Sequence, residues 1–169
     1  MKIYVLDASA LINGFYSKDS LNVMTSSTVT EIKDINTEIL LNNCINEGLI
    51  EIEQVNFEND PEVYNVLSNS GDLMRLSETD KEIVALSYKY KKLGHDVITV
   101  TDDYSMQNAL KLLDIPFKTV LTKGINETIQ WKKLCKGCRK EYPSDTKEEE
   151  CEICGSPIIR KRVNAHSNI

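Results

Sequence analysis

Short, mostly apolar runs alternate along the first two thirds of the chain with segments whose apolar residues recur at helical spacing. Ile3–Leu6 and Val97–Val100 are runs typical of strands that are buried on both faces of a parallel sheet. Leu49–Val55 alternates apolar residues with acids, which predicts a strand at or near a sheet edge. Leu21–Met24 and Phe117–Leu121 predict two shorter strands. This alternation of strands and helices predicts an α/β domain with a mainly parallel sheet.

Capping residues place the first helices between these strands. A Ser/Thr cluster at residues 25–28 predicts the start of a helix that carries Val29, Ile32 and Ile35 on one face. The next helix is predicted over residues 36–49, with an apolar stripe formed by Ile39, Leu40, Cys44 and Ile45. The lone Cys44 is therefore expected in the core.

Three further helices complete the pattern. Pro61 begins one of them, because proline is tolerated at the first helical position. Ser77 with Asp80 three residues later is typical of a capping box and starts the next helix, which is expected to end at Gly94. Residues 104–113 form the last predicted helix, which leads into the last predicted strand.

Five acidic residues stand where an α/β sheet builds its ligand site. Asp7, Asp102 and Asp103 directly follow central strands, and open parallel sheets bind ligands outside those strand ends. Glu31 lies in the helix that begins in the Ser/Thr cluster, and Asp80 lies in the first turn of the capped helix. Carboxylates gathered without basic partners are normally held ionised by Mg²⁺ or Mn²⁺, which promotes in-line hydrolysis of phosphodiesters.

Each of these acids also has a purely structural interpretation. Asp7 suits a helix N-cap, as do Asp102 and Asp103 as a pair, while Asp80 suits the capping box. Glu31 suits a solvated helix surface. Spacing alone leaves both interpretations open.

The strongest local pattern is a pair of Cys-x-x-Cys motifs, with twelve residues between them. The four cysteines are Cys135, Cys138, Cys151 and Cys154. At this spacing four thiolates bind one Zn²⁺ tetrahedrally, and so short a segment has no room for a hydrophobic core without the ion. Coordination by four cysteines makes such a zinc structural rather than catalytic. The alternative is a set of unrelated thiols or a redox pair.

The net charge changes sign along the chain. The total is −6, of which residues 1–130 contribute −9 and residues 131–169 contribute +3. Seven basic residues lie between positions 118 and 140, with Glu127 as the one acid among them. An acidic body joined to a basic segment suits a protein that holds metal ions in one part and phosphates in another.

The composition narrows the class further. With 41% hydrophobic and 27% charged residues, the chain is expected to be a soluble globular protein. No apolar run approaches the roughly 20 residues of a membrane span, and no signal-like segment opens the sequence, so a cytoplasmic location is expected. Neither a G-x-G-x-x-G motif nor a Walker loop is present, so nucleotide-cofactor folds lack their phosphate cradle.

Four short motifs, taken in order, resemble those of one family. They are Val5-Leu6-Asp7, Val29-Thr30-Glu31-Ile32, Leu76-Ser77-x-Thr79-Asp80-x-x-Ile83-x-Ala85-Leu86 and Thr101-x-Asp103-Tyr104-x-Met106-Gln107-Asn108. Together with the four cysteines they resemble the Nin-one-binding endoribonuclease family, and the likeness covers nearly the whole chain. That family joins a PIN nuclease domain to a zinc ribbon and matures the 3′ end of small-subunit ribosomal RNA. Without a long insertion in the nuclease part, the chain is similar to the compact archaeal form.

The resemblance implies a division of the chain and a set of site residues. The expected segments are a PIN-like nuclease domain over 1–122, a basic linker over 123–134, a zinc ribbon over 135–160 and a basic flexible tail over 161–169. The four acidic positions that bind catalytic Mn²⁺ or Mg²⁺ are Asp7, Glu31, Asp80 and Asp103. Asp102 is a further catalytic candidate, and Thr101 matches a position expected to orient the carboxylates by a hydrogen bond.

The implied reaction is hydrolysis of one RNA phosphodiester by a metal-activated water, without a covalent intermediate. The implied partners are precursor small-subunit rRNA and the assembling small ribosomal subunit, with an RNA-binding assembly factor as a further partner and no membrane. His95 and His166 are not placed like general acids, and both are expected at the surface.

Basic and aromatic residues after the sheet are the candidate RNA contacts. They are Lys118, Lys123, Trp131, Lys132, Lys133, Lys136, Arg139 and Lys140, with the tail at residues 160–162. Trp131 equally suits a packing contact between the two domains. The charge of the tail equally suits simple solubility.

Two other functions fit part of the pattern. One is a toxin-like or quality-control PIN ribonuclease with other RNA targets, against which the ribbon and the basic linker argue. The other is a non-catalytic RNA-binding assembly factor with a vestigial acid cluster, against which the presence of all four acids argues. A phosphatase of the haloacid dehalogenase type fits less well, since its second acid falls where this chain has Ser9.

Overall fold

The computed structural model describes residues 1–125 and 128–164. Its larger part contains a five-stranded parallel sheet with the strand order β3-β2-β1-β4-β5. The strands are β1 (Lys2–Leu6), β2 (Leu21–Thr25), β3 (Ile50–Glu53), β4 (Asp96–Val100) and β5 (Phe117–Lys118). The prediction of a parallel α/β sheet with β3 at an edge is confirmed. Since the strand order reverses between β1 and β4, the ligand crevice of this sheet lies outside the carboxyl ends of those two strands.

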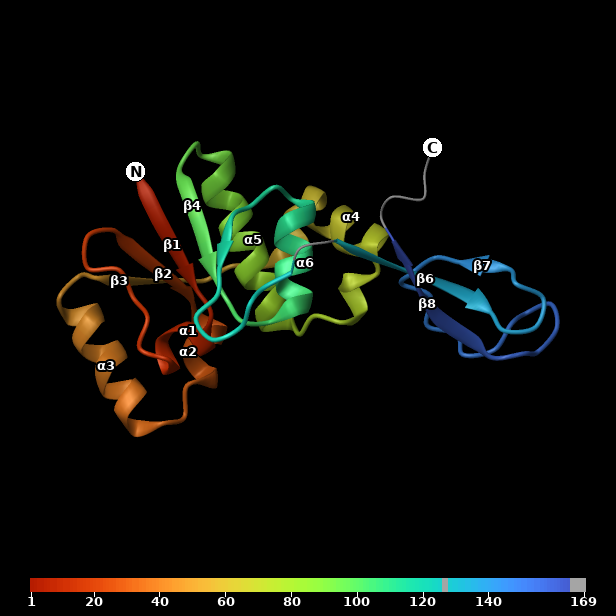
Figure 1. The fold of residues 1–169 in the computed structure, drawn as a ribbon, viewed down its shortest axis with the longest axis horizontal. Helices are drawn as coiled ribbons and strands as arrows, with labels where there is room; N and C mark the ends of the chain where they lie inside the picture. Colours follow the sequence, from red (N-terminus) through yellow and green to blue (C-terminus); the bar gives the residue numbers. More distant parts are fainter. Residues whose placement is uncertain (126–127, 165–169) are drawn as a thin grey trace.

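Helices cover both faces of the sheet (Figure 1). They are α1 (Ala8–Ile12), α2 (Ser26–Glu31), α3 (Ile35–Asn46), α4 (Pro61–Ser70), α5 (Glu78–Lys92) and α6 (Tyr104–Leu112), with short 3₁₀ turns η1 (Phe57–Asn59) and η2 (Asp72–Met74). Successive strand residues point to opposite faces. Accordingly, Ile3 and Val5 pack with α4, α5 and α6, while Leu6 and Met24 pack with α1 and α3. Cys44 is buried in the core that α1 and α3 form with the sheet, as predicted.

Two helix predictions were wrong in detail. The helix expected to continue through Ile35 ends at Glu31, because Ile32 has an extended backbone and Asp34 caps the next helix. In α3 the buried residues include Leu41 and Cys44, whereas Ile39 of the predicted stripe is 55% exposed.

The last strand of the sheet was also predicted too long. β5 ends at Lys118, although the expected strand reached Leu121. The backbone N–H groups of residues 120–122 donate to the carboxylate of Asp102 instead of to a neighbouring strand. The capping box predicted at Ser77 and Asp80 is present at the start of α5.

A second, antiparallel sheet extends away from the α/β body beside α4 (Figure 1). It has the order β7-β6-β8, formed by β6 (Ile129–Cys135), β7 (Glu141–Tyr142) and β8 (Ile158–Asn164). β6 therefore begins inside the segment predicted as a linker, and β8 continues into the predicted tail. His166 and the end of that tail lie outside the described residues. No helix in the described part of the chain has the length and apolarity needed to cross a membrane.

The fully buried Asn22 is a polar exception in the central strand β2. Its side chain accepts a hydrogen bond from the Ser17 backbone N–H at 2.8 Å and donates to the Ser17 and Leu49 carbonyl oxygens at 2.7 and 2.8 Å. The amide thus ties the loop that precedes β2 to the residue that precedes β3. The apolar pattern gave no sign of this connection.

We expect Asn22→Leu to lower the free energy of unfolding by about 2 kcal/mol, because the partly buried N–H and carbonyl of Ser17 lose the side-chain amide that binds them. Urea denaturation measures the change. Asn42→Leu, at an exposed position of α3, is the matched control and should stay within about 0.5 kcal/mol of wild type. Equal midpoints for the two variants would contradict the role of Asn22.

Candidate active site and metal centre

Asp7 lies at the carboxyl end of β1, beside the end of β4. It occupies the N-cap position of α1, but its side chain makes no capping hydrogen bond. Its Oδ2 atom accepts hydrogen bonds from the Ser9 Oγ at 2.8 Å and from the Thr101 Oγ1 at 3.0 Å. Thr101 Oγ1 in turn accepts from the backbone N–H of Asp103 at 3.1 Å. The hydrogen bond expected of Thr101 is present, and it joins the two strand ends.

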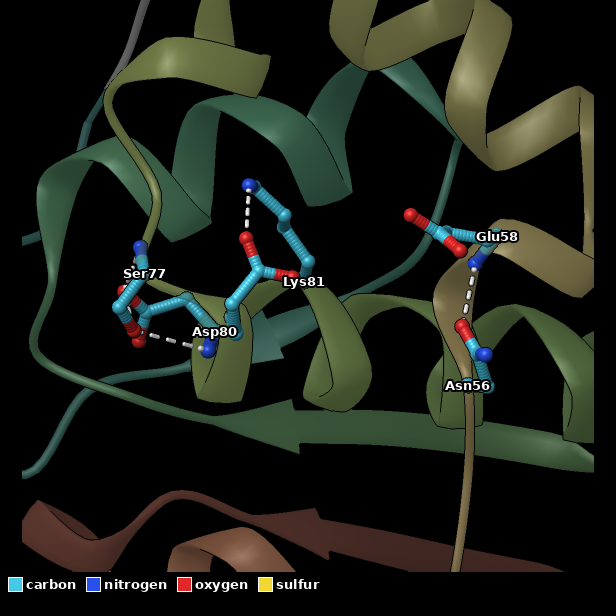
Figure 2. Close-up of polar contacts among 6 residues, drawn as sticks. Asn56, Glu58, Ser77, Asp80 and Lys81 are labelled. Carbon is cyan, nitrogen blue, oxygen red and sulfur yellow. Dashed lines mark hydrogen bonds and ion pairs between the residues drawn. The ribbon is translucent and has the colours of Figure 1, made fainter.

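The side chains of Asp80 and Asp103 are each held by hydrogen bonds in the first turn of a helix. Asp103 Oδ1 accepts from the Met106 N–H at 2.8 Å and so caps α6. Figure 2 shows Asp80 folded back onto Ser77, whose N–H and Oγ donate to Asp80 Oδ2 at 2.9 and 2.7 Å. These hydrogen bonds use one oxygen of each carboxylate. The second oxygen is thereby available as a ligand.

Electrostatic repulsion couples Asp80 to the other three predicted acids. Burial raises the pKa of Asp7, and the charge of Asp80 raises it further. Burial likewise raises the pKa of Asp80, with added repulsion from Asp103 and Glu31. Ionisation of Asp7 and Asp80 is therefore disfavoured, and a bound cation would offset this effect.

No ion pair in the described part of the chain involves these four acids. The nearest lysine in sequence, Lys81, is almost completely buried and donates to Glu78 at 2.6 Å. Its ammonium also lies over the Phe57 ring and points away from Asp80 (Figure 2). Carboxylates gathered without a basic partner are the donor set that hard divalent cations require.

The acid site is open. Within the described residues, the four cysteines have sulfur atoms that all lie within 4.8 Å of one another. The carboxylate oxygens of the acids do not form such a tight group. Glu31 and Asp103 are exposed, and Asp7 and Asp80 are half-buried. An open arrangement of a few carboxylates is typical of ions that keep several water ligands, as Mg²⁺ does.

Asp102 is placed differently from its neighbour Asp103. Its carboxylate accepts from the backbone N–H groups of Val120, Leu121 and Thr122 at 2.9 to 3.2 Å. Partial burial acts to raise the pKa of Asp102, but these hydrogen bonds outweigh it and hold the pKa below its usual value. The contacts make Asp102 the anchor of the loop after β5.

Two serines near the acids were not among the predicted site residues. Ser77 was predicted as a cap, and its hydroxyl also orients Asp80. Ser9 orients Asp7, and its one sequence signal is its position two residues after that acid. Such support depends on side-chain geometry that no motif encodes.

The four cysteines form a closed cluster at one end of the second sheet. The Sγ atoms of Cys135 and Cys154 are 3.3 Å apart, and those of Cys138 and Cys151 are 3.6 Å apart. A Cβ added at Gly137 would lie 2.5 Å from the Ser156 Oγ, so a side chain at this position would displace the Ser156 hydroxyl. The arrangement fits tetrahedral coordination of one metal ion.

At two of the four cysteines, hydrogen bonds to the sulfur atom favour the thiolate form that binds metal. Ser156 is the largest cause of the lowered Cys154 pKa, which falls to about 6. The Tyr142 hydroxyl donates to Cys151 Sγ at 3.0 Å and lowers the pKa of that thiol. Two ligands are therefore prepared for metal by their neighbours.

The predicted RNA contacts lie in two places. Lys118 lies at the end of β5, where its carbonyl accepts from the Thr101 N–H at 3.1 Å, and is the one nearest the acids by topology. The others lie in the segment before β6 or in the second sheet; these are Lys123, Lys132, Lys133, Lys136, Arg139 and Lys140. Lys132 and Lys140 pair with Glu141 and Glu152. The two sheets thus carry separate parts of the predicted contact set.

Trp131 lies where the second sheet meets the α/β body. The guanidinium groups of Arg75 and Arg160 lie over its ring, at 4.6 and 5.4 Å from the centroid. A Cβ added at Gly71 would lie 2.8 Å from Trp131 Cβ and O. These contacts are those of the domain-packing alternative, and stacking on RNA stays a prediction.

Comparison with known proteins decides between the predicted classes. A family model described as the PIN domain of ribonuclease matches residues 4–90. Endoribonuclease Nob1 of Methanothermobacter thermautotrophicus is 46% identical over 94% of this chain and 92% of its own length. Endoribonuclease Nob1 of Methanocaldococcus jannaschii is 35% identical over 98% of this chain and 80% of its own length. The chain belongs to the Nob1 endoribonuclease family.

Membership of the Nob1 family confirms the resemblance predicted from the four motifs. Ribonuclease VapC1 of Thermoplasma acidophilum is also similar, at 34% identity over 94% of this chain and 77% of its own length. The ribonuclease names of the domain match and of the relatives do not favour the non-catalytic alternative. The toxin-like alternative is not favoured either, because a Nob1 protein is 46% identical to this chain and VapC1 only 34%.

Asp102→Ala should lower the free energy of unfolding by about 2 kcal/mol, since three backbone donors lose a charged acceptor. Mn²⁺ binding should be unchanged. Asp19→Ala, at an exposed loop position, is the control for both measurements, made by urea denaturation and by titration calorimetry. Unchanged stability with lost Mn²⁺ binding would instead assign Asp102 to the metal site.

Cys154→Ser should release the ion of the cysteine cluster and unfold the second sheet while the α/β body remains folded. Elemental analysis measures the metal content, and NMR spectra report the two sheets separately. Cys44→Ala, which alters the core cysteine, should keep the ion. The same metal content in Cys154→Ser and wild type would show that the cluster is not the binding site.

Proposed function

We propose that this chain is a metal-dependent endoribonuclease that hydrolyses one phosphodiester of precursor small-subunit rRNA to form its mature 3′ end. The proposal rests on the position of Asp7 and Asp103 after the neighbouring strands β1 and β4, with Asp80 repelled by Asp103. None of these three acids takes part in an ion pair in the described part of the chain. Membership of a family whose relatives are named endoribonucleases supports it.

One group of residues binds the catalytic ion, and a second group orients the carboxylates that bind it. Asp7, Glu31, Asp80 and Asp103 bind Mn²⁺ or Mg²⁺. When bound, such an ion supplies activation of water and neutralisation of the phosphate charge. Thr101 and Ser9 hold one oxygen of Asp7, and Ser77 holds one oxygen of Asp80, which leaves the other oxygen of each carboxylate available to hold the ion.

The cysteine cluster holds a structural Zn²⁺. Four thiolates leave no open coordination position, so this ion has no direct part in the hydrolysis. The cluster instead shapes the second sheet, which presents basic residues to RNA.

Like charges that face each other across β6 and β8 support RNA binding by the second sheet. Lys132 lies opposite Lys161, on the face of the sheet away from Arg160, whose guanidinium is bound at Gly71 and Trp131. Directly opposed like charges destabilise an antiparallel pair. Phosphate groups offset this repulsion, so we expect an RNA backbone along this sheet, with counterion release on binding.

The RNA approaches the acids from the Lys118 side. Across α5 from Asp80 lies a hollow of about 690 Å³ whose lining includes Glu58, Glu78 and Glu82. These carboxylates repel phosphate groups. Lys118 is exposed on the other side of the switch point and offers a positive charge.

The proposed setting is the assembling small ribosomal subunit in the cytoplasm, with an RNA-binding assembly factor as a further partner. The proposed units are the nuclease domain over 1–122 and the zinc ribbon over 135–160, with the segment 123–134 between them and a basic tail after residue 160.

The test uses a labelled RNA that spans the 3′ end of small-subunit rRNA and its precursor extension, incubated with the protein and Mn²⁺. We expect one cut at the mature end. Asp103→Asn should reduce its rate about a hundredfold or more, the size expected when a group that stabilises the reacting charge is lost. Asp19→Asn, which is exposed and distant, is the matched control.

Each alternative outcome identifies another function. Tight binding without a cut under any metal would support the non-catalytic assembly factor. Scattered cuts that still require Asp103 would support a ribonuclease with other targets.

A further inference from the structure

The α/β body holds the first residue of β6 through a single side chain. Asn108, on α6, accepts a hydrogen bond from the Ile129 N–H at 2.6 Å and donates to the Ile129 carbonyl at 2.8 Å. The amide thereby makes the pair of contacts that a neighbouring strand would make. An antiparallel strand is thus attached to a helix of the nuclease body.

A buried carboxylate fixes the orientation of that amide. Asp72 is fully buried and accepts from the Asn108 Nδ2 and the Ser70 Oγ at 2.8 and 2.7 Å. Its Oδ1 atom is buried without a partner in the described chain. Burial raises the pKa of Asp72 despite the nearby Arg75 and Arg160. A carboxylate this desolvated persists only where its surroundings hold it in place.

Packing closes the contact on its other side. Arg160 of β8 donates to the Gly71 carbonyl at 2.6 Å and lies over Trp131 of β6. The close approach of Gly71 to the Trp131 backbone leaves no room for a side chain. We call the set Gly71, Asp72, Asn108, Trp131 and Arg160 the junction.

The junction shares its elements with the acid site. Asn108 lies five residues after Asp103, on the helix that Asp103 caps, which is about 7.5 Å along the axis. Asp72 lies in the turn that leads to Ser77 and Asp80. A shift of the second sheet at the junction therefore acts on the same helix and turn that place two of the acids.

We propose that the junction holds the second sheet in one orientation against the nuclease body, and that it thereby determines which phosphodiester of a bound RNA reaches the acids. The second half of this inference rests on the proposed function. The junction residues are positioning residues, since none of them contacts the acid cluster directly.

Trp131 is the one tryptophan of the chain, so its fluorescence reports on the junction directly. We expect weak quenching by acrylamide in the wild type and several-fold stronger quenching in Asn108→Ala. Arg160→Lys keeps the charge but loses the fork that binds Gly71, and should give an intermediate value. Asn42→Ala, exposed on α3, is the control. Strong quenching in the wild type, or equal quenching in Asn108→Ala and wild type, would overturn the locked junction.

The positions of the cuts test whether the junction determines which phosphodiester reaches the acids. On the long RNA, Asn108→Ala and Arg160→Lys should spread the cut over neighbouring phosphodiesters. The rate of Asn108→Ala on a short oligonucleotide that reaches only the acids should stay within about twofold of wild type, since no group at the reacting phosphate changes. A single unchanged cut in a variant with exposed Trp131 would overturn this half. No cut by the wild type would overturn the proposed function, while the fluorescence would still decide whether the junction is locked.

Discussion

Burial of carboxylates, together with their mutual repulsion, is the constraint on which the site depends. Asp7 and Asp80 lie on different elements, and burial and their neighbours raise the pKa of both. The two cores fix the ends of β1 and β4 and the start of α5, so the acids cannot move apart without loss of packing. A divalent cation removes the repulsion. The destabilisation that the fold tolerates thus becomes binding free energy for the ion.

The two candidate metal sites differ in how accessible a bound ion would be. The cysteine cluster is closed, and its hydrogen bonds from Ser156 and Tyr142 favour thiolates. It suits an ion that holds a small sheet together. The acid site is open, as suits an ion that must meet a substrate. The junction at Asn108 and Trp131 connects the sheet that carries one site to the body that carries the other.

Local patterns predicted most of the α/β body. The position of Asp7 after an apolar strand and the capping box of Ser77 with Asp80 were both predicted correctly. Each of these signals lies within a few residues of sequence. The sequence did not predict where α2 ends, since the cap at Asp34 interrupts an apolar period that continues through it. It also did not predict the hydrogen bonds that Asp102 accepts from the loop after β5, whose N–H donors lie about twenty residues away in the sequence. Contacts across the chain, rather than local propensity, decided these features.

The binding of Mn²⁺ to the acid site tests the central claim most directly. Free Mn²⁺ has an electron paramagnetic resonance signal that is lost on binding, so a titration gives the affinity without RNA or catalysis. The predicted result is binding by the wild type that Asp7→Asn weakens by about tenfold or more, while Asp19→Asn leaves it unchanged. Equal affinity of wild type and Asp7→Asn would contradict the claim that these carboxylates are held together for a cation.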